Sequence, residues 1–146
     1  MTEINPKNSL SLGNINGPES RVLKVTRILF VEDDKVNQML GCKMLTKLGY
    51  HVDVADDGCE ALKLLKINSY DILITDIKTP NMDGYQLAEH IRNCEEAYKA
   101  IPIIAISAYP SSFEKQKAIA SGLNDYVSKP FSIVELVTAI SPYLNS

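Results

Sequence analysis

The chain has 146 residues, of which 45% are hydrophobic and 23% are charged, so it is long enough for one globular domain with a substantial core. Its formal net charge is −3, which argues against a dedicated nucleic-acid surface. No apolar run approaches the roughly 20 residues of a membrane-spanning helix, and the N-terminus lacks the basic start and apolar stretch of a secretion signal. We therefore expect a cytoplasmic protein that contacts neither nucleic acid nor membrane.

The cysteines and histidines carry no recognisable chemistry. Cys42, Cys59 and Cys94 are odd in number and form no Cys-x-x-Cys pair. Because disulfide frameworks belong to oxidising compartments, we expect reduced thiols. His51 and His90 lack a metal-ligand partner at a useful spacing, and we assign them no role.

The N-terminal segment differs in composition from the rest of the chain. Residues 1–20 are rich in Asn, Ser, Gly and Pro and contain only isolated apolar residues, so they cannot bury much surface. We expect residues 1–24 to form a flexible arm or linker, in which only residues 21–24 have the composition for a short ordered turn. Residues 25–146 then form the folded domain.

From Val25 onward, short apolar segments alternate with amphipathic ones. Continuous apolar runs, such as residues 28–31 and 103–106, are typical of strands that are covered on both faces. The pattern predicts strands near residues 26–32, 51–55, 71–76, 102–107 and 125–128. It predicts helices near residues 35–48, 58–67, 84–94, 112–121 and 132–140. The first helix carries an apolar ridge at i, i+4 spacing that consists of Val36, Leu40, Met44 and Leu48, with Met39 beside it.

Capping residues mark the helix ends. Gly49 is a candidate C-cap of the first helix. Four segments have a capping residue followed three positions later by Glu or Gln, which is the pattern of a capping box: Asp57-x-x-Glu60, Asp83-x-x-Gln86, Ser111-x-x-Glu114 and Ser132-x-x-Glu135. Because each follows a predicted strand, the pattern indicates βα units. Five such units imply a parallel sheet with helices on both faces and right-handed crossovers.

Acidic residues follow two of the predicted strands. Glu32, Asp33 and Asp34 end the first strand, and Asp76 ends the third. In open parallel sheets, ligands bind beyond the carboxyl ends of the strands where the strand order reverses. The carboxylates therefore converge if the order is 2-1-3-4-5, which periodicity alone does not fix. Converging carboxylates raise their own pKa values unless a cation neutralises them, and hard oxygen ligands suit Mg²⁺ or Mn²⁺.

Taken together, several segments of the chain resemble the receiver domain of two-component response regulators. The matching segments are residues 28–34 (ILFVEDD), 71–76 (DILITD), 80–84 (PNMDG), 105–108 (AISA) and 125–130 (DYVSKP). They occur in family order and at family-like spacing over roughly residues 25–144. The resemblance implies an α/β, flavodoxin-like, doubly wound (βα)5 fold with a five-stranded parallel sheet of order 2-1-3-4-5.

The resemblance also implies an acceptor and a metal site. Asp76 is similar to the phosphoacceptor, and Glu32 and Asp33 to the acidic pair that binds Mg²⁺ directly or through water. The backbone carbonyl of Lys78 is a further implied metal ligand. A carboxylate is the nucleophile of aspartyl-phosphate chemistry, and bound Mg²⁺ would neutralise charge on the phosphoryl oxygens.

Three more residues match the family's phosphoryl-binding and switch positions. Ser107 resembles the hydroxyl residue that hydrogen-bonds the phosphoryl group, and Lys129 resembles the lysine that pairs with it. Tyr126 resembles the aromatic switch residue. Phosphorylation would pull Ser107 inward and let Tyr126 rotate, which would change the face formed by the fourth helix, fifth strand and fifth helix. The Lys129–Pro130 bond resembles the family's cis peptide.

The chain departs from the family pattern in the same region. Glu32 stands where many receivers have Asp, and Thr79 replaces a usual Met. One extra methylene in Glu32 should not abolish metal binding. Lys78 places a cation two positions after the acceptor, and we hypothesise that it tunes autodephosphorylation by blocking or positioning the attacking water.

Two other classes of protein compete with this interpretation. A phosphatase of the haloacid dehalogenase type also forms an aspartyl phosphate, but it requires a second Asp two positions after the nucleophile, where this chain has Lys78. A pseudo-receiver would bind partners without taking phosphate, and the complete set of site residues weighs against it. We therefore expect a phosphoacceptor signalling domain that catalyses only its own phosphorylation and dephosphorylation.

The implied partners are proteins. The chain ends shortly after Leu144, so we expect a single-domain regulator or the receiver of a hybrid histidine kinase, and residues 36–38 together with the polar arm favour the second origin. The donor would be a histidine kinase or a histidine phosphotransfer protein. The acceptor would be a downstream protein target or a phosphotransfer domain.

Overall fold

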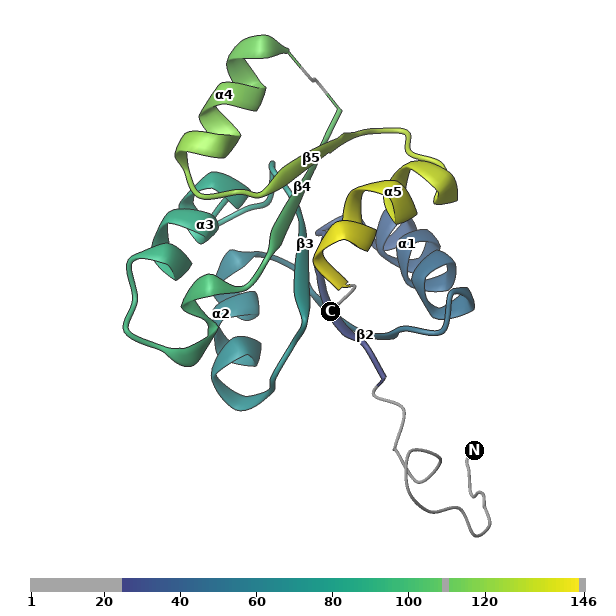
Figure 1. The fold of residues 1–146 in the computed structure, drawn as a ribbon, viewed down its shortest axis with the longest axis horizontal. Helices are drawn as coiled ribbons and strands as arrows, with labels where there is room; N and C mark the ends of the chain where they lie inside the picture. Colours follow the sequence, from purple (N-terminus) through teal and green to yellow (C-terminus); the bar gives the residue numbers. More distant parts are fainter. Residues whose placement is uncertain (1–24, 109–110, 145–146) are drawn as a thin grey trace, which may run out of the picture.

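The computed structural model describes residues 25–108 and 111–144 (Figure 1). The predicted N-terminal arm, residues 1–24, lies outside these described residues. Within them, one parallel sheet has the strand order β2-β1-β3-β4-β5. Its strands are β1 (Arg27–Val31), β2 (His51–Ala55), β3 (Ile72–Asp76), β4 (Ile103–Ser107) and β5 (Asp125–Ser128). This order confirms the predicted flavodoxin-like fold.

Helices cover both faces of the sheet. They are α1 (Lys35–Lys47), α2 (Gly58–Ile67), α3 (Gly84–Arg92), α4 (Ser112–Ala120) and α5 (Ile133–Leu144). Figure 1 shows α1 and α5 on one face and α2, α3 and α4 on the other. A short 3₁₀ helix, η2 (Ala97–Ala100), precedes β4 and was not predicted. Among the described helices, none is long and apolar enough to cross a membrane.

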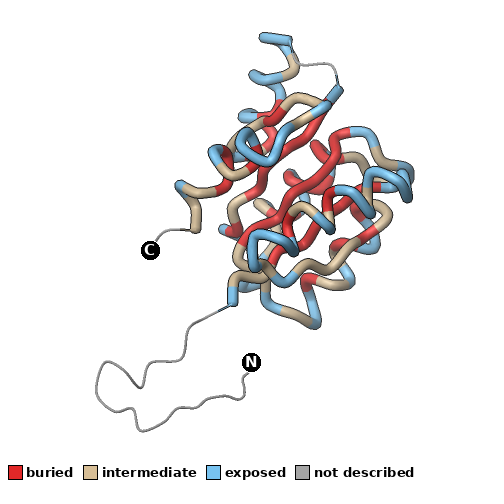
Figure 2. The backbone as a smooth tube through the Cα atoms, turned by 90° about the vertical axis from the view of Figure 1, so that its right-hand side faces the viewer, coloured by how far each residue is buried: buried red, intermediate tan, exposed pale blue. Residues whose placement is uncertain are grey.

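Alternation along the strands divides the core into two layers. Leu29, Leu73 and Ile103 belong to the layer on the α2 side, whereas their neighbours Ile72 and Ile104 belong to the layer on the α5 side. Both layers are buried, which is why the central strands read as continuous apolar runs. Figure 2 shows these strands as a buried band between the exposed helices.

The predicted C-cap at Gly49 forms a Schellman-type ending of α1. Leu48 is the C-cap itself, and Gly49 follows it with a φ of 94°. The Gly49 N–H donates to the Thr46 carbonyl at 2.9 Å, and the Tyr50 N–H donates to the Leu45 carbonyl at 3.3 Å. Glycine suits this position because a side chain is disfavoured in the left-handed region.

Two of the four predicted capping boxes are reciprocal. At α3, Asp83 accepts from the Gln86 N–H while Gln86 accepts from the Asp83 N–H. Ser132 and Glu135 exchange the same pair of bonds, at 3.1 and 2.9 Å. Both boxes satisfy backbone donors that the first turn of a helix would otherwise leave unpaired.

At α2 and α4 only one bond of each capping box forms. The side chains of Asp57 and Ser111 accept from the N–H groups three residues later, but the two Glu carboxylates bind elsewhere. The Glu60 carboxylate accepts from the Asp56 N–H at 2.6 Å, one residue before the cap. The Glu114 carboxylate accepts from the Tyr85 hydroxyl at 2.6 Å and so links α4 to α3. The sequence pattern was therefore right about where these helices begin and wrong about the second bond.

Helix bounds differ most at α3 and α5. Helix α3 ends at Arg92, with Asn93 as its C-cap, instead of continuing to residue 94. Helix α5 runs to Leu144 instead of stopping at residue 140, although Pro142 lies inside it. Pro142 lacks a backbone N–H and so removes one hydrogen bond from the last turn of the helix. The hydroxyl of Tyr143 donates to the Asn124 carbonyl at 3.1 Å and helps to hold this last turn.

Most residues of the apolar ridge of α1 are exposed, although Met44 packs against the core layer on the α5 side. Val36, Met39 and Leu40 have exposed fractions of 60%, 58% and 53%. The fully buried residues of α1 are instead Gly41 and Leu45. A Cβ atom at Gly41 would lie 2.5 Å from the Phe30 ring, so the helix approaches the sheet through its glycine. An amphipathic stripe normally covers the core, and most of this one is left on the surface.

Candidate functional site

The carboxyl ends of β1 and β3 bring three carboxylates together. Glu32 and Asp33 follow β1, Asp76 ends β3, and the two strands are hydrogen-bonded neighbours. One carboxylate oxygen from each residue lies within 4.8 Å of the other two. Glu32 and Asp76 are buried, whereas Asp33 is exposed. A set of carboxylate oxygens that is open on one side fits a hard divalent cation that keeps part of its water shell.

Lys129 reaches the same cluster from the end of β5. Its Nζ atom lies 2.9 Å from Glu32 Oε1 and 2.8 Å from Asp76 Oδ2. Its backbone N–H donates to the Ser107 carbonyl at 2.8 Å, which ties the residue to the end of β4. The Lys129–Pro130 peptide is cis, as the resemblance implied.

The electrostatics of the cluster show an excess of negative charge. Burial raises the pKa of the Glu32 carboxyl above its ordinary value, and the charge of Asp76 adds to that shift, although the hydrogen bond from Lys129 opposes it. Burial disfavours the charge of Lys129, but its hydrogen bonds to Asp76 and Glu32 prevail and raise its pKa. The Lys129 ammonium thus pairs with two of the three clustered carboxylates, and a further positive charge would be favourable beside them.

The loop before α1 is fixed around Glu32. The Asp34 N–H donates to Glu32 Oε2 at 3.1 Å, and the Glu32 N–H donates to the Ala55 carbonyl at 3.0 Å. Asp34 itself is the N-cap of α1 and accepts from the N–H groups of Val36 and Asn37. The start of α1 therefore sets the position of the acidic pair.

The loop after β3 contacts the carboxylate of Asp76. The Lys78 N–H donates to Asp76 Oδ1 at 3.3 Å, and the Lys78 side chain is exposed. The Thr79 hydroxyl donates to the Met82 carbonyl at 2.7 Å and so braces the loop. A Cβ atom at Gly84 would lie 2.9 Å from the Asp76 carbonyl oxygen, so only glycine fits there. Metal binding by the Lys78 carbonyl stays a prediction.

Ser107 and Tyr126 lie on the two strands beyond β3. Ser107 is buried at the end of β4. The ring of Tyr126 packs against the core layer on the α2 side. Its hydroxyl is buried and has no hydrogen-bond partner among the described residues. A buried hydroxyl without a partner costs about 1–3 kcal/mol, so a small rearrangement of this side chain can gain free energy.

One contact near these residues had no signal in the sequence. Tyr85 lies on α3, donates its hydroxyl to Glu114, and packs its ring 4.4 Å from the Lys117 ammonium. The contact joins α3 to α4 beside the predicted switch. It depends on how two helices lie against each other, which residue spacing within one helix does not reveal.

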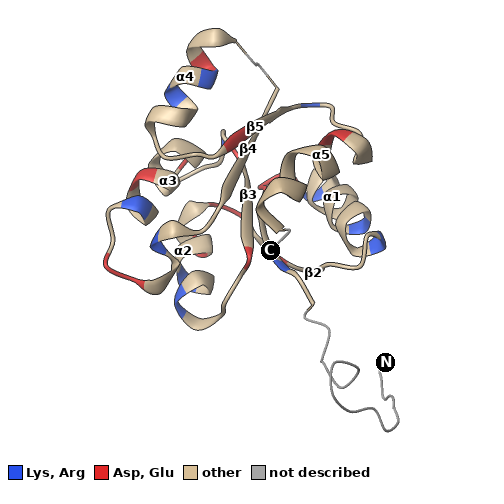
Figure 3. Ribbon diagram, in the orientation of Figure 1, with Lys and Arg blue, Asp and Glu red and all other residues tan. Residues whose placement is uncertain are grey.

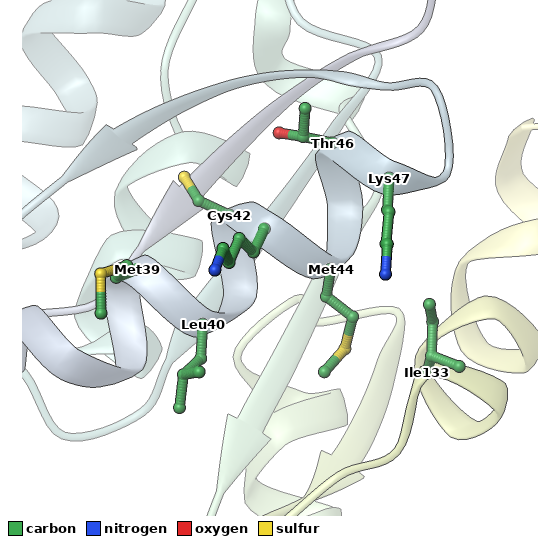
Figure 4. A pocket seen from close by; sticks show the side chains of 8 residues that line it. Met39, Leu40, Cys42, Met44, Thr46, Lys47 and Ile133 are labelled. Atoms are coloured by element: carbon green, nitrogen blue, oxygen red, sulfur yellow. The ribbon is translucent and has the colours of Figure 1, made fainter.

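An apolar groove lies between α1 and the start of α5. Met39, Leu40, Met44 and Ile133 line it together with the basic residues Lys43 and Lys47 (Figure 4). Figure 3 shows basic residues on α1, which lies next to α5. An adjoining hollow shares Leu40 and Met44 and extends to Lys129, Pro130 and Phe131. The groove therefore leads from the surface of α1 to the residue that bridges Glu32 and Asp76.

Comparison with known proteins identifies the family. The family model of the response regulator receiver domain matches residues 28–141. The chain therefore belongs to the response regulator receiver domain family.

Similar proteins include sensor proteins that are much longer than this chain. The chain is 35% identical over 116 residues to sensor histidine kinase RcsC of Salmonella typhi, which covers 80% of the chain and 12% of RcsC. It is 37% identical over 114 residues to sensor protein EvgS of Escherichia coli K12, covering 78% of the chain and 9% of EvgS. It is 40% identical over 119 residues to hybrid signal transduction histidine kinase G of Dictyostelium discoideum, covering 80% and 4%. The chain thus spans a small part of each relative.

Solved receiver domains share the fold. The receiver domain of sensor histidine kinase PA1611 from Pseudomonas aeruginosa PAO1 superimposes with a TM-score of 0.77 at 34% identity, covering 84% of the chain and 100% of that domain. In that structure a magnesium ion is coordinated in the active-site cleft. Chemotaxis protein CheY4 of Vibrio cholerae superimposes with a TM-score of 0.78 at 28% identity, covering 83% and 100%.

Proposed function

We propose that this receiver domain accepts a phosphoryl group from a phosphohistidine donor onto Asp76 in a Mg²⁺-dependent reaction. The observation that carries the proposal is the position of the Lys129 ammonium, which lies within 2.9 Å of both Glu32 and Asp76 inside a cluster of three carboxylates. A carboxylate placed beside a fixed cation and a cation-binding pair has what phosphoryl transfer requires.

The chemistry exchanges one bond for another. A carboxylate oxygen of Asp76 attacks phosphorus as the bond from phosphorus to the donor imidazole nitrogen breaks, and the imidazole leaves with the bonding electrons. Glu32, Asp33 and Asp76 would hold Mg²⁺, which neutralises charge on the phosphoryl oxygens when bound. Lys129 stabilises that charge from its own side, and we assign the Ser107 hydroxyl a hydrogen bond to the same group.

The response to phosphorylation would pass through β4 and β5. Ser107 moves toward the phosphoryl group, and Tyr126 changes position with it. The buried hydroxyl of Tyr126 supports this role, because it gains free energy when it finds a partner. The face formed by α4, β5 and α5 changes as a result, and a downstream protein target or phosphotransfer domain binds that face or receives the phosphoryl group.

We assign Lys78 a role in the lifetime of the phosphorylated state. Its side chain is exposed two residues after Asp76, and its backbone N–H already contacts the Asp76 carboxylate. A cation there can block or orient the water that attacks the acyl phosphate. Lys78→Ala should change the lifetime of phosphorylated Asp76, and an unchanged decay rate would refute this role.

The donor is a histidine kinase or a histidine phosphotransfer protein that docks a helix in the α1 groove. The groove is apolar, its rim carries Lys43 and Lys47, and it continues to Lys129. A helix with an apolar stripe and acidic neighbours complements such a surface. Leu40→Glu should slow transfer from a protein donor about tenfold or more while leaving phosphorylation by acetyl phosphate unchanged. Equal slowing with both donors would argue against docking at this groove.

Two further features complete the proposal. Cys42, Cys59 and Cys94 are free thiols, which suits a cytoplasmic domain. The position two residues after Asp76 is Lys78 and supplies no second carboxylate for general acid and base chemistry, so the domain catalyses its own phosphorylation and dephosphorylation and turns over no other substrate.

Acetyl phosphate tests this function without a protein partner. Incubation with acetyl phosphate and Mg²⁺ should add one phosphoryl group to the intact mass of the wild-type protein. The same treatment should leave Asp76→Asn, or wild-type protein in EDTA, unmodified. A wild-type mass that does not change, or an Asp76→Asn mass that does, would contradict the proposal.

A further inference from the structure

The side chain of Gln38 links Glu32, which follows β1, to Asp56 in the loop after β2. Its side-chain Nε2 donates one hydrogen bond to the Glu32 backbone carbonyl at 2.7 Å and another to Asp56 Oδ1 at 2.9 Å. Both protons of the amide group are therefore used. The residue is half-buried in the first turn of α1, where it lies between the loop after β1 and the loop after β2.

The bond to Glu32 fixes the peptide that leads to Asp33. The Glu32 N–H, Oε1 and Oε2 are already held by Ala55, Lys129 and Asp34. Gln38 supplies the partner of the remaining polar atom, the carbonyl oxygen. That carbonyl belongs to the planar peptide between Glu32 and Asp33. Its direction therefore fixes the position of the Asp33 backbone, from which the exposed carboxylate extends.

The other bond of Gln38 ends on a charged anchor. Asp56 also receives the Lys35 ammonium at 2.7 Å, and its backbone N–H donates to Glu60 at 2.6 Å. The hydrogen bonds from Lys35 and Gln38 lower the pKa of the Asp56 carboxyl, so it is ionised at neutral pH. A hydrogen bond to an ionised acceptor is stronger than one between neutral groups.

We propose that Gln38 is a positioning residue for the metal site, which orients the Glu32–Asp33 peptide and so raises the affinity for Mg²⁺ without touching the ion or the phosphoryl group. The inference rests on the proposed function, and it adds to that site a residue that is not one of the acidic metal ligands. Hydrogen-bond partners behind metal ligands commonly contribute about 10–100-fold in metal affinity.

The test compares two substitutions by calorimetric titration with Mg²⁺. Gln38→Met keeps the length of the side chain and removes both donors, so its dissociation constant should rise about tenfold. Gln116→Met makes the same change at an exposed position of α4 and should leave the affinity unchanged.

The outcomes separate a positioning role from a structural one. Should Gln38→Met unfold more easily in urea yet bind Mg²⁺ as tightly as wild type, the residue only stabilises the fold and the proposal is wrong. If Gln38→Met does not fold, Asp56→Asn weakens the same anchor and should give a smaller loss of affinity, and unchanged affinity there would count against the proposal. Failure of wild-type protein to bind Mg²⁺ at all would instead refute the proposed function.

Discussion

The two ends of the sheet hold clusters of charged residues that differ in how large their excess of negative charge is. Near the amino ends of the strands, the Arg27 N–H donates to Asp71 at 2.8 Å, and the Arg27 guanidinium lies 3.6 Å from Asp53. The Tyr70 hydroxyl donates to Asp53 at 2.7 Å, and the Arg27 guanidinium lies 5.7 Å from the centre of the Tyr70 ring. We call these four residues the amino-end cluster. Each of its carboxylates has a donor or a cation supplied by the fold.

The carboxyl-end cluster consists of Glu32, Asp33, Asp76 and Lys129, and it holds three carboxylates and one ammonium group. Lys129 pairs with Glu32 and Asp76, and burial raises the pKa of Glu32. Charge that the fold itself leaves uncompensated is a mark of a binding site, since it costs stability until a ligand arrives. The difference teaches that the balance of charge, more than the number of charged residues, separates a functional cluster from a structural one.

Lys129→Met should produce the largest effect. Without the ammonium group, charge on the phosphoryl oxygens loses a fixed partner, and the rate of phosphorylation by acetyl phosphate should fall about 100-fold. A time course of intact mass measures the rate. A rate within threefold of wild type would mean that the carboxyl-end cluster does not act as a unit. Asp53→Asn in the amino-end cluster is the matched control and should keep the wild-type rate.

Mg²⁺ should stabilise the fold only through the carboxyl-end cluster. At a free concentration 100 times its dissociation constant, a ligand of the native state adds about 2.7 kcal/mol to the free energy of unfolding. Urea titrations with Mg²⁺ and with EDTA measure this increment. Asp33→Asn should lose most of it, and Asp53→Asn should retain it. If Mg²⁺ raised the free energy of unfolding equally in the two variants, the carboxyl-end cluster would not be the metal site.

Tyr70→Phe should weaken the fold without touching the metal site. The hydroxyl donates to an acceptor at 2.7 Å, and loss of such a hydrogen bond costs about 1 kcal/mol of the free energy of unfolding at neutral pH. Urea unfolding measures the loss, and the Mg²⁺ increment of this variant should match wild type. A changed Mg²⁺ increment would show that the two ends of the sheet are coupled.

The same tyrosine predicts a small effect at high pH. Burial and the hydrogen bond to Asp53 raise the pKa of Tyr70 from 10.0 to about 12. Between these values the unfolded chain has lost the proton that the folded chain still holds, so the stability contributed by Tyr70 is complete below pH 10 and falls as pH rises toward 12. The advantage of wild type over Tyr70→Phe should therefore shrink across this range. An advantage that grows would contradict the sign of the shift.

The sequence predicted the fold well because the relevant signals are local. Apolar runs and capping residues depend on neighbours within one turn or one strand, and Gly49 behaves as expected. The convergence of Glu32, Asp33 and Asp76 was predicted for the strand order 2-1-3-4-5, since strand ends of a parallel sheet meet at one edge, and the structure has that order.

The features that the sequence did not reveal depend on contacts between elements. The apolar ridge of α1 was visible in the sequence, but the face that packs on the sheet is set by the close approach of Gly41 to Phe30. The contact between Tyr85 and Glu114 and the bridge made by Gln38 join segments far apart in the chain. Periodicity within one helix contains no information about such pairings.

Chemical trapping of the acyl phosphate tests the central claim most directly. Borohydride reduces an aspartyl phosphate to homoserine, which peptide sequencing can locate. Wild-type protein treated with acetyl phosphate and Mg²⁺ should yield homoserine at position 76, and protein treated in EDTA should yield almost none. Homoserine at another position, or equal yields with and without Mg²⁺, would contradict an account in which the carboxylates at the ends of β1 and β3 form one metal-dependent acceptor site.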